Sequence, residues 1–322
     1  MQVSLGRIAE GAIQGILPLF STQQVRKPVS AVLIIFNPAS GQGRQAFVEQ
    51  VAQSLRELSW DVSLYPTRCA GDATRFLQQY SGPLDVVAVA GGDGTLNEVV
   101  NGLSERNSDS YRLALIPTGT TNVLAMELGV QRQLQQIVDI ITAGKETTVY
   151  PGRVNGRRFM LMAGIGYDAW VVDKVNLKLK KKVGKLAYVL SMLKELRRFG
   201  SKTYVLDVDG ERHEANSVVI TNGRYYGGSF VISRQAGLGK ADTQVLMISG
   251  RNPLHFLLVL LGLPLGIMEK MPGIRSVSAR KVIVHDKDQN AVPEPVQADG
   301  DSLATLPLTL EMESTALRVL VP

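Results

Sequence analysis

Residues 86–101, VVAVAGGDGTLNEVVN, constrain the fold more than any other part of the chain. An apolar run ends abruptly at the turn GGDGT (91–95), and a helical pattern follows it. This order predicts a buried parallel strand, a glycine turn and the start of a helix. Glycines let the backbone approach a ligand closely, and the amides at a helix N-terminus attract phosphate. Asp93 would repel phosphate unless a cation lay between them, so the turn indicates Mg²⁺. The alternative interpretation is a tight turn with an exposed aspartate.

Alternating strands and helices extend this pattern through the first part of the chain. Apolar runs predict strands at 31–36, 61–65, 85–90 and 113–117, and a helical pattern follows each of them. Strands of this kind occur in parallel sheets that helices cover on both faces. We therefore predict a three-layer α/β domain over residues 28–146.

From about Thr147 short strand-like runs predominate, separated by turn residues. They lie at 148–154, 157–163, 203–209, 216–221, 244–249, 282–285 and 306–312. Short strand-like runs separated by turn residues are typical of antiparallel β structure. We predict a β-sandwich domain over 147–322, with an inserted helix at 184–198.

Two apolar segments lie outside this pattern. Residues 1–27 form an N-terminal extension with helical apolar spacing, which predicts an amphipathic helix that lies on a membrane or packs on the protein body. Glu10 interrupts it and no small-residue cleavage site follows, so a signal peptide is not expected. The run 253–268 is shorter than the roughly 20 residues of a spanning helix, so we expect a buried or interfacial element.

Cysteine and histidine usage excludes two classes of site. Cys69 is the single cysteine, so no intrachain disulfide can form and a reducing compartment is expected. The three histidines are widely spaced and belong to no ligand pattern, so structural zinc is not expected.

The formal charge of +6 is concentrated in one segment. Nine Lys and Arg residues and one acid, Glu195, lie between Lys174 and Arg198. A solvated helix face and a surface that docks on an anionic membrane are the two interpretations. No aromatic residues alternate with these lysines as a nucleic-acid stacking platform requires, so nucleic acid is not expected as a partner.

Glycine-rich and polar turns follow all four predicted strands of the first domain. They occupy residues 37–44, 67–72, 91–98 and 117–122. The carboxyl ends of parallel strands lie on one side of a sheet, and ligands bind there. We therefore predict a nucleotide cleft where the four turns meet. It has neither the dinucleotide fingerprint GxGxxG after the first strand nor the Walker motif GxxxxGK[ST].

Six motifs together resemble the diacylglycerol kinase catalytic domain family, in its bacterial lipid kinase branch (YegS/DgkB-like). They are NPASG (37–41), GGDGTLNE (91–98), PTGTTN (117–122), GIGYDA (164–169), NGRYYGG (222–228) and DGD (299–301). The resemblance covers roughly residues 30–322 and is specific as a set. GGDGT alone also occurs in NAD kinases and phosphofructokinases.

The resemblance implies a fold and an ATP site. The fold would be a diacylglycerol-kinase-like or NAD-kinase-like α/β domain followed by the β-sandwich. ATP would be held by residues of the four turns, namely Asn37, Pro38, Ser40, Gly41, Thr67, Gly91, Gly92, Asp93, Gly94, Thr95, Leu96, Asn97, Gly119, Thr120 and Asn122.

The resemblance also implies the catalytic groups. Asp93 would organise the catalytic Mg²⁺, through water. The final acid of the family's Asp-Gly-Glu is the proposed base for the lipid hydroxyl, and here Asp301 occupies that place. Because Asp301 is one methylene shorter, Asp299 is the alternative base. Asp168 would reach the same cleft and support the metal or the acceptor hydroxyl. Some relatives hold a structural metal before a late strand, but here only Asp242 is acidic and Lys240 lies beside it, so that metal is not expected.

The expected function is an ATP- and Mg²⁺-dependent lipid kinase that most simply converts diacylglycerol to phosphatidic acid. It would be cytoplasmic and peripherally associated with the inner face of the plasma membrane through residues 174–198. A homodimer through exposed strand edges is a further expectation. The rival interpretations are a soluble kinase of the NAD kinase type and a catalytically silent lipid- or nucleotide-binding regulator.

Overall fold

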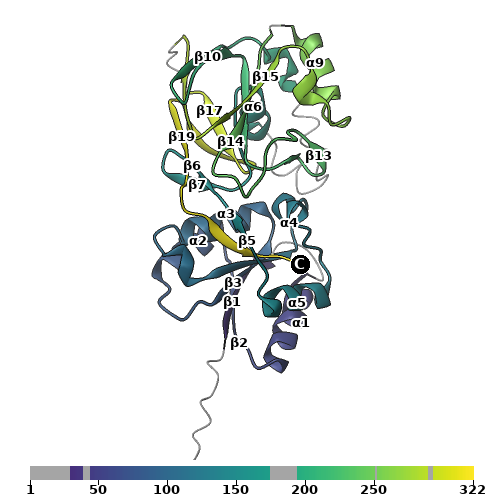
Figure 1. Cartoon of the computed structure of the whole chain (residues 1–322), viewed down its shortest axis with the longest axis vertical. Coiled ribbons are helices and arrows are strands. Elements are labelled where there is room, and N and C mark those ends of the chain that lie inside the picture. The colour runs from purple at the N-terminus through teal and green to yellow at the C-terminus, as the bar shows by residue number, and fades with distance from the viewer. Residues whose placement is uncertain (1–29, 39–43, 175–193, 251, 289–292) are drawn as a thin grey trace, which may run out of the picture.

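The computed structural model describes residues 30–38, 44–174, 194–250, 252–288 and 293–322. These residues form two domains that lie one above the other along the long axis of the molecule (Figure 1). The predicted extension 1–27 and most of the basic segment 174–198 lie outside the described residues.

The first domain is built on a six-stranded sheet. Its strands are β1 (Ala31–Phe36), β2 (Asp61–Pro66), β3 (Val86–Gly91), β4 (Arg112–Pro117), β5 (Glu146–Val149) and β20 (Leu317–Leu320). The strand order is β2-β1-β3-β4-β20-β5. Strands β1 to β4 run parallel, and β1 and β3 are buried along their whole length. Their continuous apolar runs fit a sheet that is covered on both faces.

Helices cover both faces of this sheet. They are α1 (Arg44–Glu57), α2 (Asp72–Gln79), α3 (Asp93–Gly102), α4 (Val123–Glu127) and α5 (Leu134–Ala143), with a short 3₁₀ turn η2 (Ser108–Ser110). Helix α1 packs beside α5, and α2 packs beside α3. The predicted three-layer α/β domain is confirmed.

The second domain is a sandwich of two antiparallel sheets. One has the order β10-β9-β16-β19-β6-β7 and the other β15-β14-β11-β8-β17-β18. The strands are β6 (Gly152–Val154), β7 (Arg157–Phe159), β8 (Met162–Ile165), β9 (Tyr204–Val208), β10 (Glu211–Ala215), β11 (Ser217–Thr221), β14 (Thr243–Ile248), β15 (Ile274–Ala279), β16 (Lys281–Asp286), β17 (Pro295–Ala298), β18 (Asp301–Thr305) and β19 (Leu308–Met312). A separate hairpin joins β12 (Tyr225–Tyr226) to β13 (Phe230–Val231). The predicted β-sandwich is confirmed.

Helical segments cover the outer face of the second sheet. They are α6 (Tyr167–Asp173), η3 (Leu196–Arg198), α9 (Pro253–Leu261) and η4 (Met268–Lys270). Alternation along β11 separates two cores. Val218 and Ile220 face the core between the sheets, whereas Val219 packs with the helical segments.

The end of the chain returns to the first sheet, whereas the sequence analysis placed all of 147–322 in the second domain. Strand β20 pairs with β4 in parallel and with β5 antiparallel. Its buried Leu317, Val319 and Leu320 belong to the core of the first domain. The sequence of β20 does not indicate which sheet it joins, because a short apolar strand can be buried in the core of either domain.

Two helical predictions have different outcomes. Of the predicted helix 184–198, residues 184–193 lie outside the described part, Lys194 and Glu195 are helical, and Leu196–Arg198 follow as a 3₁₀ turn. The apolar run 253–268 forms the nine-residue helix α9 and the loop after it. Among the described residues, no helix is both long and apolar enough to cross a membrane.

Candidate active site

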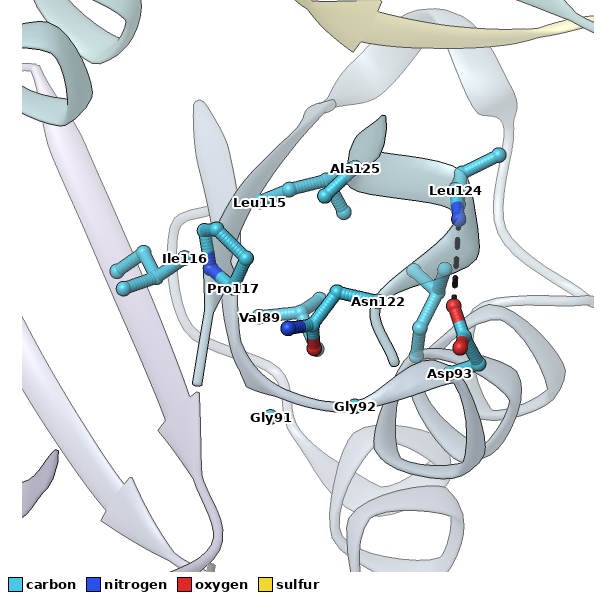
Figure 2. A pocket seen from close by; sticks show the side chains of 11 residues that line it. Val89, Gly91, Gly92, Asp93, Leu115, Ile116, Pro117, Asn122, Leu124 and Ala125 are labelled. Carbon is cyan, nitrogen blue, oxygen red and sulfur yellow. Dashed lines mark hydrogen bonds between the residues drawn. The ribbon is translucent and has the colours of Figure 1, made fainter. Parts of the chain in front are cut away.

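Two glycine turns of the first domain pack directly against each other. The β3–α3 turn carries Gly91 and Gly92, and the β4–α4 turn carries Gly119 (Figure 2). A Cβ on Gly119 would lie 2.8 Å from Gly92 N of the first turn, and one on Gly91 would lie 2.5 Å from Thr95 Cβ within its own turn. Real Cβ atoms do not approach so closely, so the absence of side chains lets the turns meet.

The amide side chain of Asn122 fixes the second turn. Its Oδ1 accepts a hydrogen bond from Gly119 N at 2.9 Å, and its Nδ2 donates to Gly119 O at 2.9 Å. Asn122 has φ +51°, a left-handed conformation that asparagine tolerates better than most residues. The two turns border a small open cavity of about 20 Å³, with room for about one water molecule.

Asp93 joins the first turn to the start of α4. One carboxylate oxygen accepts a hydrogen bond from Val123 N at 3.1 Å and the other from Leu124 N at 3.3 Å; the bond to Leu124 is drawn in Figure 2. Burial raises the pKa of Asp93, and these two amides oppose that shift. The carboxylate therefore has a structural task that the sequence did not indicate.

The donor set around Asp93 fits Mg²⁺ bound largely through phosphate and water. A carboxylate oxygen has two acceptor positions, so each oxygen of Asp93 keeps one beyond its backbone partner. In the described part of the chain, no three His, Cys, Asp or Glu side chains gather as a metal-binding group. Mg²⁺ commonly keeps several waters and needs only one or two carboxylates beside substrate phosphates.

Several of the other predicted ATP residues can be placed individually. Asn37 and Thr67 lie at the same sheet edge, because Asn37 N donates to Ala90 O at 3.2 Å and Thr67 N to Phe36 O at 2.8 Å. Ser40 and Gly41 lie outside the described residues. The Leu96 side chain is buried in the core of the first domain, and the Asn97 amide nitrogen donates to Asp299 Oδ2 and to Arg158 O. Their contact with ATP stays a prediction.

Asp299 occupies a turn between β17 and β18 and is fully engaged. Its carboxylate accepts hydrogen bonds from four donors, which are Asn97 Nδ2 at 2.8 Å, Met160 N at 2.7 Å, Leu161 N at 2.8 Å and Met162 N at 3.1 Å. Burial raises the pKa of Asp299, and these donors oppose that shift. Because a carboxylate has about four acceptor positions, Asp299 has none left for a substrate proton.

Asp301 is placed differently, although it is only two residues away. Its side chain is exposed, and Oδ2 lies 3.7 Å from the point that a Cβ on Gly94 would occupy. A carboxylate of the second domain therefore lies beside the glycine turn of the first. Of the two candidate bases, only Asp301 has a carboxylate that can reach a ligand.

Asp168 lies behind the turn that carries Asp301. Its buried carboxylate accepts hydrogen bonds from the Tyr226 hydroxyl and from Gln297 Nε2, the latter at 2.6 Å. Gln297 Oε1 in turn accepts a hydrogen bond from Gly300 N at 3.0 Å. Burial raises the pKa of Asp168, and its two donors oppose that shift. In the described contacts Asp168 supports the turn, whereas the sequence analysis placed it at the metal or the acceptor hydroxyl.

Glu127 is a site residue that the sequence analysis missed. It ends α4, and its Oε1 accepts a hydrogen bond from Tyr225 N of the second domain at 2.8 Å. Helix α4 is thus held by Asp93 at its start and by the β12 strand at its end. The available signal was an acid in an otherwise apolar stretch, VLAMELGV (123–130).

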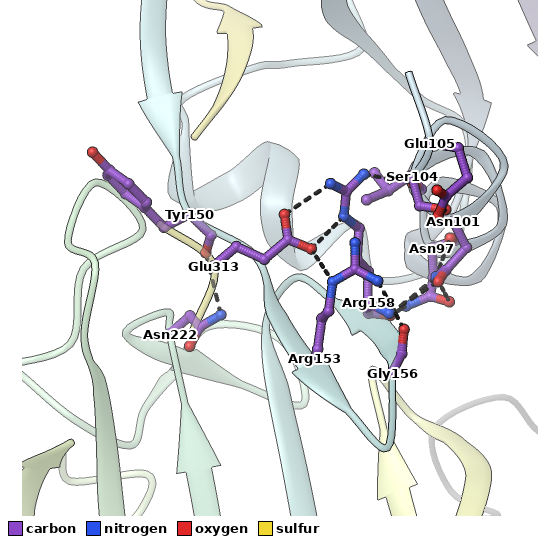
Figure 3. A network of polar contacts seen from close by, with 11 residues as sticks. Asn97, Asn101, Ser104, Glu105, Tyr150, Arg153, Gly156, Arg158, Asn222 and Glu313 are labelled. Atoms are coloured by element: carbon purple, nitrogen blue, oxygen red, sulfur yellow. Dashed lines mark hydrogen bonds and ion pairs between the residues drawn. The ribbon is translucent and has the colours of Figure 1, made fainter. Parts of the chain in front are cut away.

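A polar network fixes α3 to the second domain (Figure 3). Arg158 forms a bidentate ion pair with Glu313 at 2.6 and 2.8 Å, and its backbone oxygen accepts from Asn97 at 3.1 Å and from Asn101 at 3.0 Å. The same Glu313 also pairs with Arg153 at 2.6 Å. Helix α3 begins at Asp93, so this network fixes how the glycine turn faces the second domain.

Two family models cover almost all of the described chain. The diacylglycerol kinase catalytic domain matches residues 31–154, and the YegS C-terminal NAD kinase beta sandwich-like domain matches residues 162–321. A diacylglycerol kinase of Bacillus subtilis is 31% identical over 233 residues, which cover 70% of this chain and 76% of that protein. The chain belongs to the diacylglycerol kinase family. A diacylglycerol kinase of Staphylococcus aureus is 32% identical over 190 residues, or 58% of this chain and 59% of that protein.

Solved structures share the fold of this diacylglycerol kinase family member. A diacylglycerol kinase of Bacillus anthracis superposes with a TM-score of 0.73 at 24% identity, over 92% of this chain and 99% of that one. Yeast NADH kinase complexed with NADH has a TM-score of 0.52 at 13% identity, over 92% of this chain and 84% of that one. The protein is an ATP-dependent lipid kinase, a phosphotransferase that acts on an alcohol. The alternative of an NAD-kinase-type enzyme has less support.

Proposed function

We propose that this kinase transfers the γ-phosphoryl group of ATP to the free hydroxyl of diacylglycerol and forms phosphatidic acid. The names of the relatives from Bacillus subtilis and Staphylococcus aureus support this acceptor. The observation that carries the proposal is the position of Asp301 beside Gly94. It brings an accessible carboxylate to the turn where phosphate would lie.

ATP would bind along the carboxyl edge of the first sheet. The turns that contain Gly91 to Thr95 and Gly119 to Asn122 would approach the phosphates with backbone amides, because their glycines leave no side chain in the way. Asn37, Pro38, Thr67 and Thr120 would complete the site. Ser40 and Gly41 of the first turn are assigned to it from the sequence motif alone.

Asp301 would act as the general base. The hydroxyl oxygen of the lipid attacks the γ-phosphorus, its proton passes to the Asp301 carboxylate, and the bond from the γ-phosphorus to the bridging oxygen breaks to release ADP. Asp299 would hold the turn in place through its four donors. Asp168 would help to position the turn that carries Asp301, through its hydrogen bond with Gln297 and the bond of Gln297 with Gly300.

Asp93 would hold Mg²⁺ through water, using the acceptor positions that its backbone partners leave open. When bound, Mg²⁺ neutralises phosphate charge and helps to align the γ-phosphoryl group. The chain itself fixes the Asp93 carboxylate through Val123 and Leu124 before any metal arrives.

We place the kinase at the inner face of the plasma membrane, with the basic segment 174–198 toward anionic lipid. Each basic residue near such a surface contributes roughly 1 kcal/mol. The charge of this segment supports the placement. A homodimer through strand edges stays a prediction.

The test is transfer of labelled γ-phosphate from ATP to a panel of lipids in mixed micelles, with wild type and Asp301→Asn side by side. Label in diacylglycerol, lost in the variant, is the expected result. Label in another lipid instead would identify that lipid as the acceptor and would still support a lipid kinase reaction. Phosphorylation of NAD and of no lipid would overturn the proposal.

A further inference from the structure

Helix α9 is apolar apart from His255, whose Nε2 lies 3.0 Å from Pro272 O, but the helix is only half buried. Its residues PLHFLLVLL include a buried pair, Phe256 and Val259, which pack with Tyr167 and Trp170 of α6. A helix that is apolar on nearly all sides is normally enclosed by protein or lies in a membrane. The outward side of α9 therefore requires an explanation.

Exposed apolar side chains of α9 and of the loop after it make up this outward side, which we call the leucine face. Its side chains are between 39 and 68% exposed and are Leu254, Leu258, Leu261, Leu265 and Ile267. Within α9 the spacing of four and three residues places the first three on one side of the helix. Exposed apolar patches mark interaction sites more often than chance.

Exposed cations lie on the segments next to α9 and its loop. The turn η3, which contacts α9, carries Arg197 and Arg198, and Arg198 also lies over the Trp170 ring at 4.4 Å. Arg234 donates to Gly266 O of the loop at 3.4 Å, and Lys270 follows the loop.

Two acids lie on the same segments. Glu195 forms an ion pair with Arg198 at 2.9 Å, which offsets the charge of that arginine. Glu269 accepts hydrogen bonds from Ser233 Oγ at 2.5 Å and from Arg234 N at 3.0 Å. Because these four cations outnumber the two acids, the segments next to the leucine face carry a net positive charge.

We propose that the leucine face inserts into the interface of an anionic lipid bilayer. At about 1.5 Å per residue α9 is about 13 Å long, too short to span a bilayer but suited to lie in its headgroup region. The net positive charge of the neighbouring segments favours an anionic membrane over a protein partner with a neutral surface. The inference rests on the proposed lipid kinase function and adds a docking element formed by α9 and the loop after it.

The leucine face also has a short connection to the proposed site. Phe256 and Val259 share their cluster with Tyr226, whose hydroxyl donates to Asp168. Val231 of β13 lies next to Gly266 of the loop, and Figure 1 shows β13 on the side of the second domain that faces the first. Insertion would thus hold the bilayer beside the elements that support Asp301.

The test is flotation with vesicles in the absence of ATP and diacylglycerol. Wild type is compared with the triple variant Leu254→Ser, Leu258→Ser and Leu261→Ser, on vesicles of phosphatidylcholine with phosphatidylglycerol and on phosphatidylcholine alone. We expect wild type to bind the anionic vesicles, and the triple variant to bind them about tenfold more weakly or worse. Activity on a short-chain diacylglycerol dispersed in water should be retained in the triple variant.

A matched pair of single variants controls for the loss of an exposed leucine. Leu258 is 51% exposed on the leucine face, and Leu58 is 55% exposed at the end of α1 in the first domain. Leu258→Ser should weaken vesicle binding and Leu58→Ser should not. Equal vesicle binding by wild type and the triple variant would overturn the proposal. The proposal would also be overturned if wild type were a dimer, the triple variant were a monomer, and both bound vesicles equally well.

This design separates the inference from the function on which it rests. If no lipid is phosphorylated but the leucine face is still needed for vesicle binding, the function fails and the docking surface stands. If diacylglycerol is phosphorylated but the triple variant binds vesicles as wild type does, the docking proposal is wrong and the proposed function stands.

Discussion

The carboxylate of Asp299 accepts a hydrogen bond from the side-chain amide of Asn97 at 2.8 Å, although 202 residues separate the two in sequence. Asn97 belongs to the helix that begins at the glycine turn, and Asp299 begins the turn that presents Asp301. The contact therefore links the proposed phosphate-binding element to the proposed base.

Asp299→Asn should destabilise the protein strongly. An asparagine oxygen replaces only part of the acceptor capacity, which leaves backbone donors of residues 160–162 buried without partners. At about 1–3 kcal/mol for each orphaned donor, we expect a loss of about 2–4 kcal/mol in the free energy of unfolding. Urea unfolding measures it.

Asp209→Asn is the control for this variant. Asp209 shares the left-handed conformation, with φ +50°, and accepts from the amides of Arg280 and Lys281, but on the surface. Water can replace its lost bonds, so a much smaller loss is expected. Equal losses in the two variants would contradict the anchoring role of Asp299.

Asp301→Asn should abolish most activity without changing stability. Its side chain is exposed, and general-base catalysis typically contributes 10²- to 10⁴-fold, so kcat should fall by about that factor while Tm stays close to wild type. Asp301→Glu keeps a carboxylate at this position and should retain much of the wild-type rate. A kcat of Asp301→Asn near wild type would exclude Asp301 as the base.

Much of the fold could be predicted from the sequence because its signals are local. The apolar runs of β1 and β3 and the glycine turn after β3 specify a parallel sheet and its ligand edge without reference to distant residues. The destination of β20 could not be predicted, because it depends on which of two cores has a free sheet edge. The residues of that strand carry no information about the edge.

The candidate site divides in the same way. The motifs brought Asp93, Asp299 and Asp301 to attention, but spacing alone could not tell which carboxylate is free. That distinction arises from partners far away in sequence, such as the amides of residues 160–162 for Asp299. Gln297 was missed because one amide in a short apolar strand has no recognisable pattern until its partners Asp168 and Gly300 are known.

Gly119→Ala should weaken ATP binding. The added Cβ would lie 2.8 Å from Gly92 N and force the two glycine turns apart. We expect the KM for ATP to rise by about tenfold or more, because misplacement of positioning groups by about 1 Å is costly. Gly239→Ala is the control, since its Cβ would meet only Thr148 O at an ordinary 3.5 Å. An unchanged KM for ATP in Gly119→Ala would remove the β4–α4 turn from the ATP site.

Glu127→Gln should make the protein more stable at neutral and alkaline pH. Burial raises the pKa of Glu127 above its ordinary 4.5, with the amide of Tyr225 in opposition. The folded state therefore binds this proton more tightly than the unfolded state, and ionisation of the group costs stability as pH rises through the folded pKa. Glutamine keeps an oxygen for Tyr225 N but carries no charge.

Thermal unfolding across pH measures this effect. The Tm of Glu127→Gln should exceed that of wild type at about pH 8, and the difference should vanish as pH falls below about 4.5, where both side chains are neutral. Glu49→Gln, on the exposed side of α1, gives the background for a surface glutamate. If Glu127→Gln were less stable than wild type at alkaline pH, the charged hydrogen bond to Tyr225 would outweigh the cost of burial, and α4 would be held to the second domain by charge.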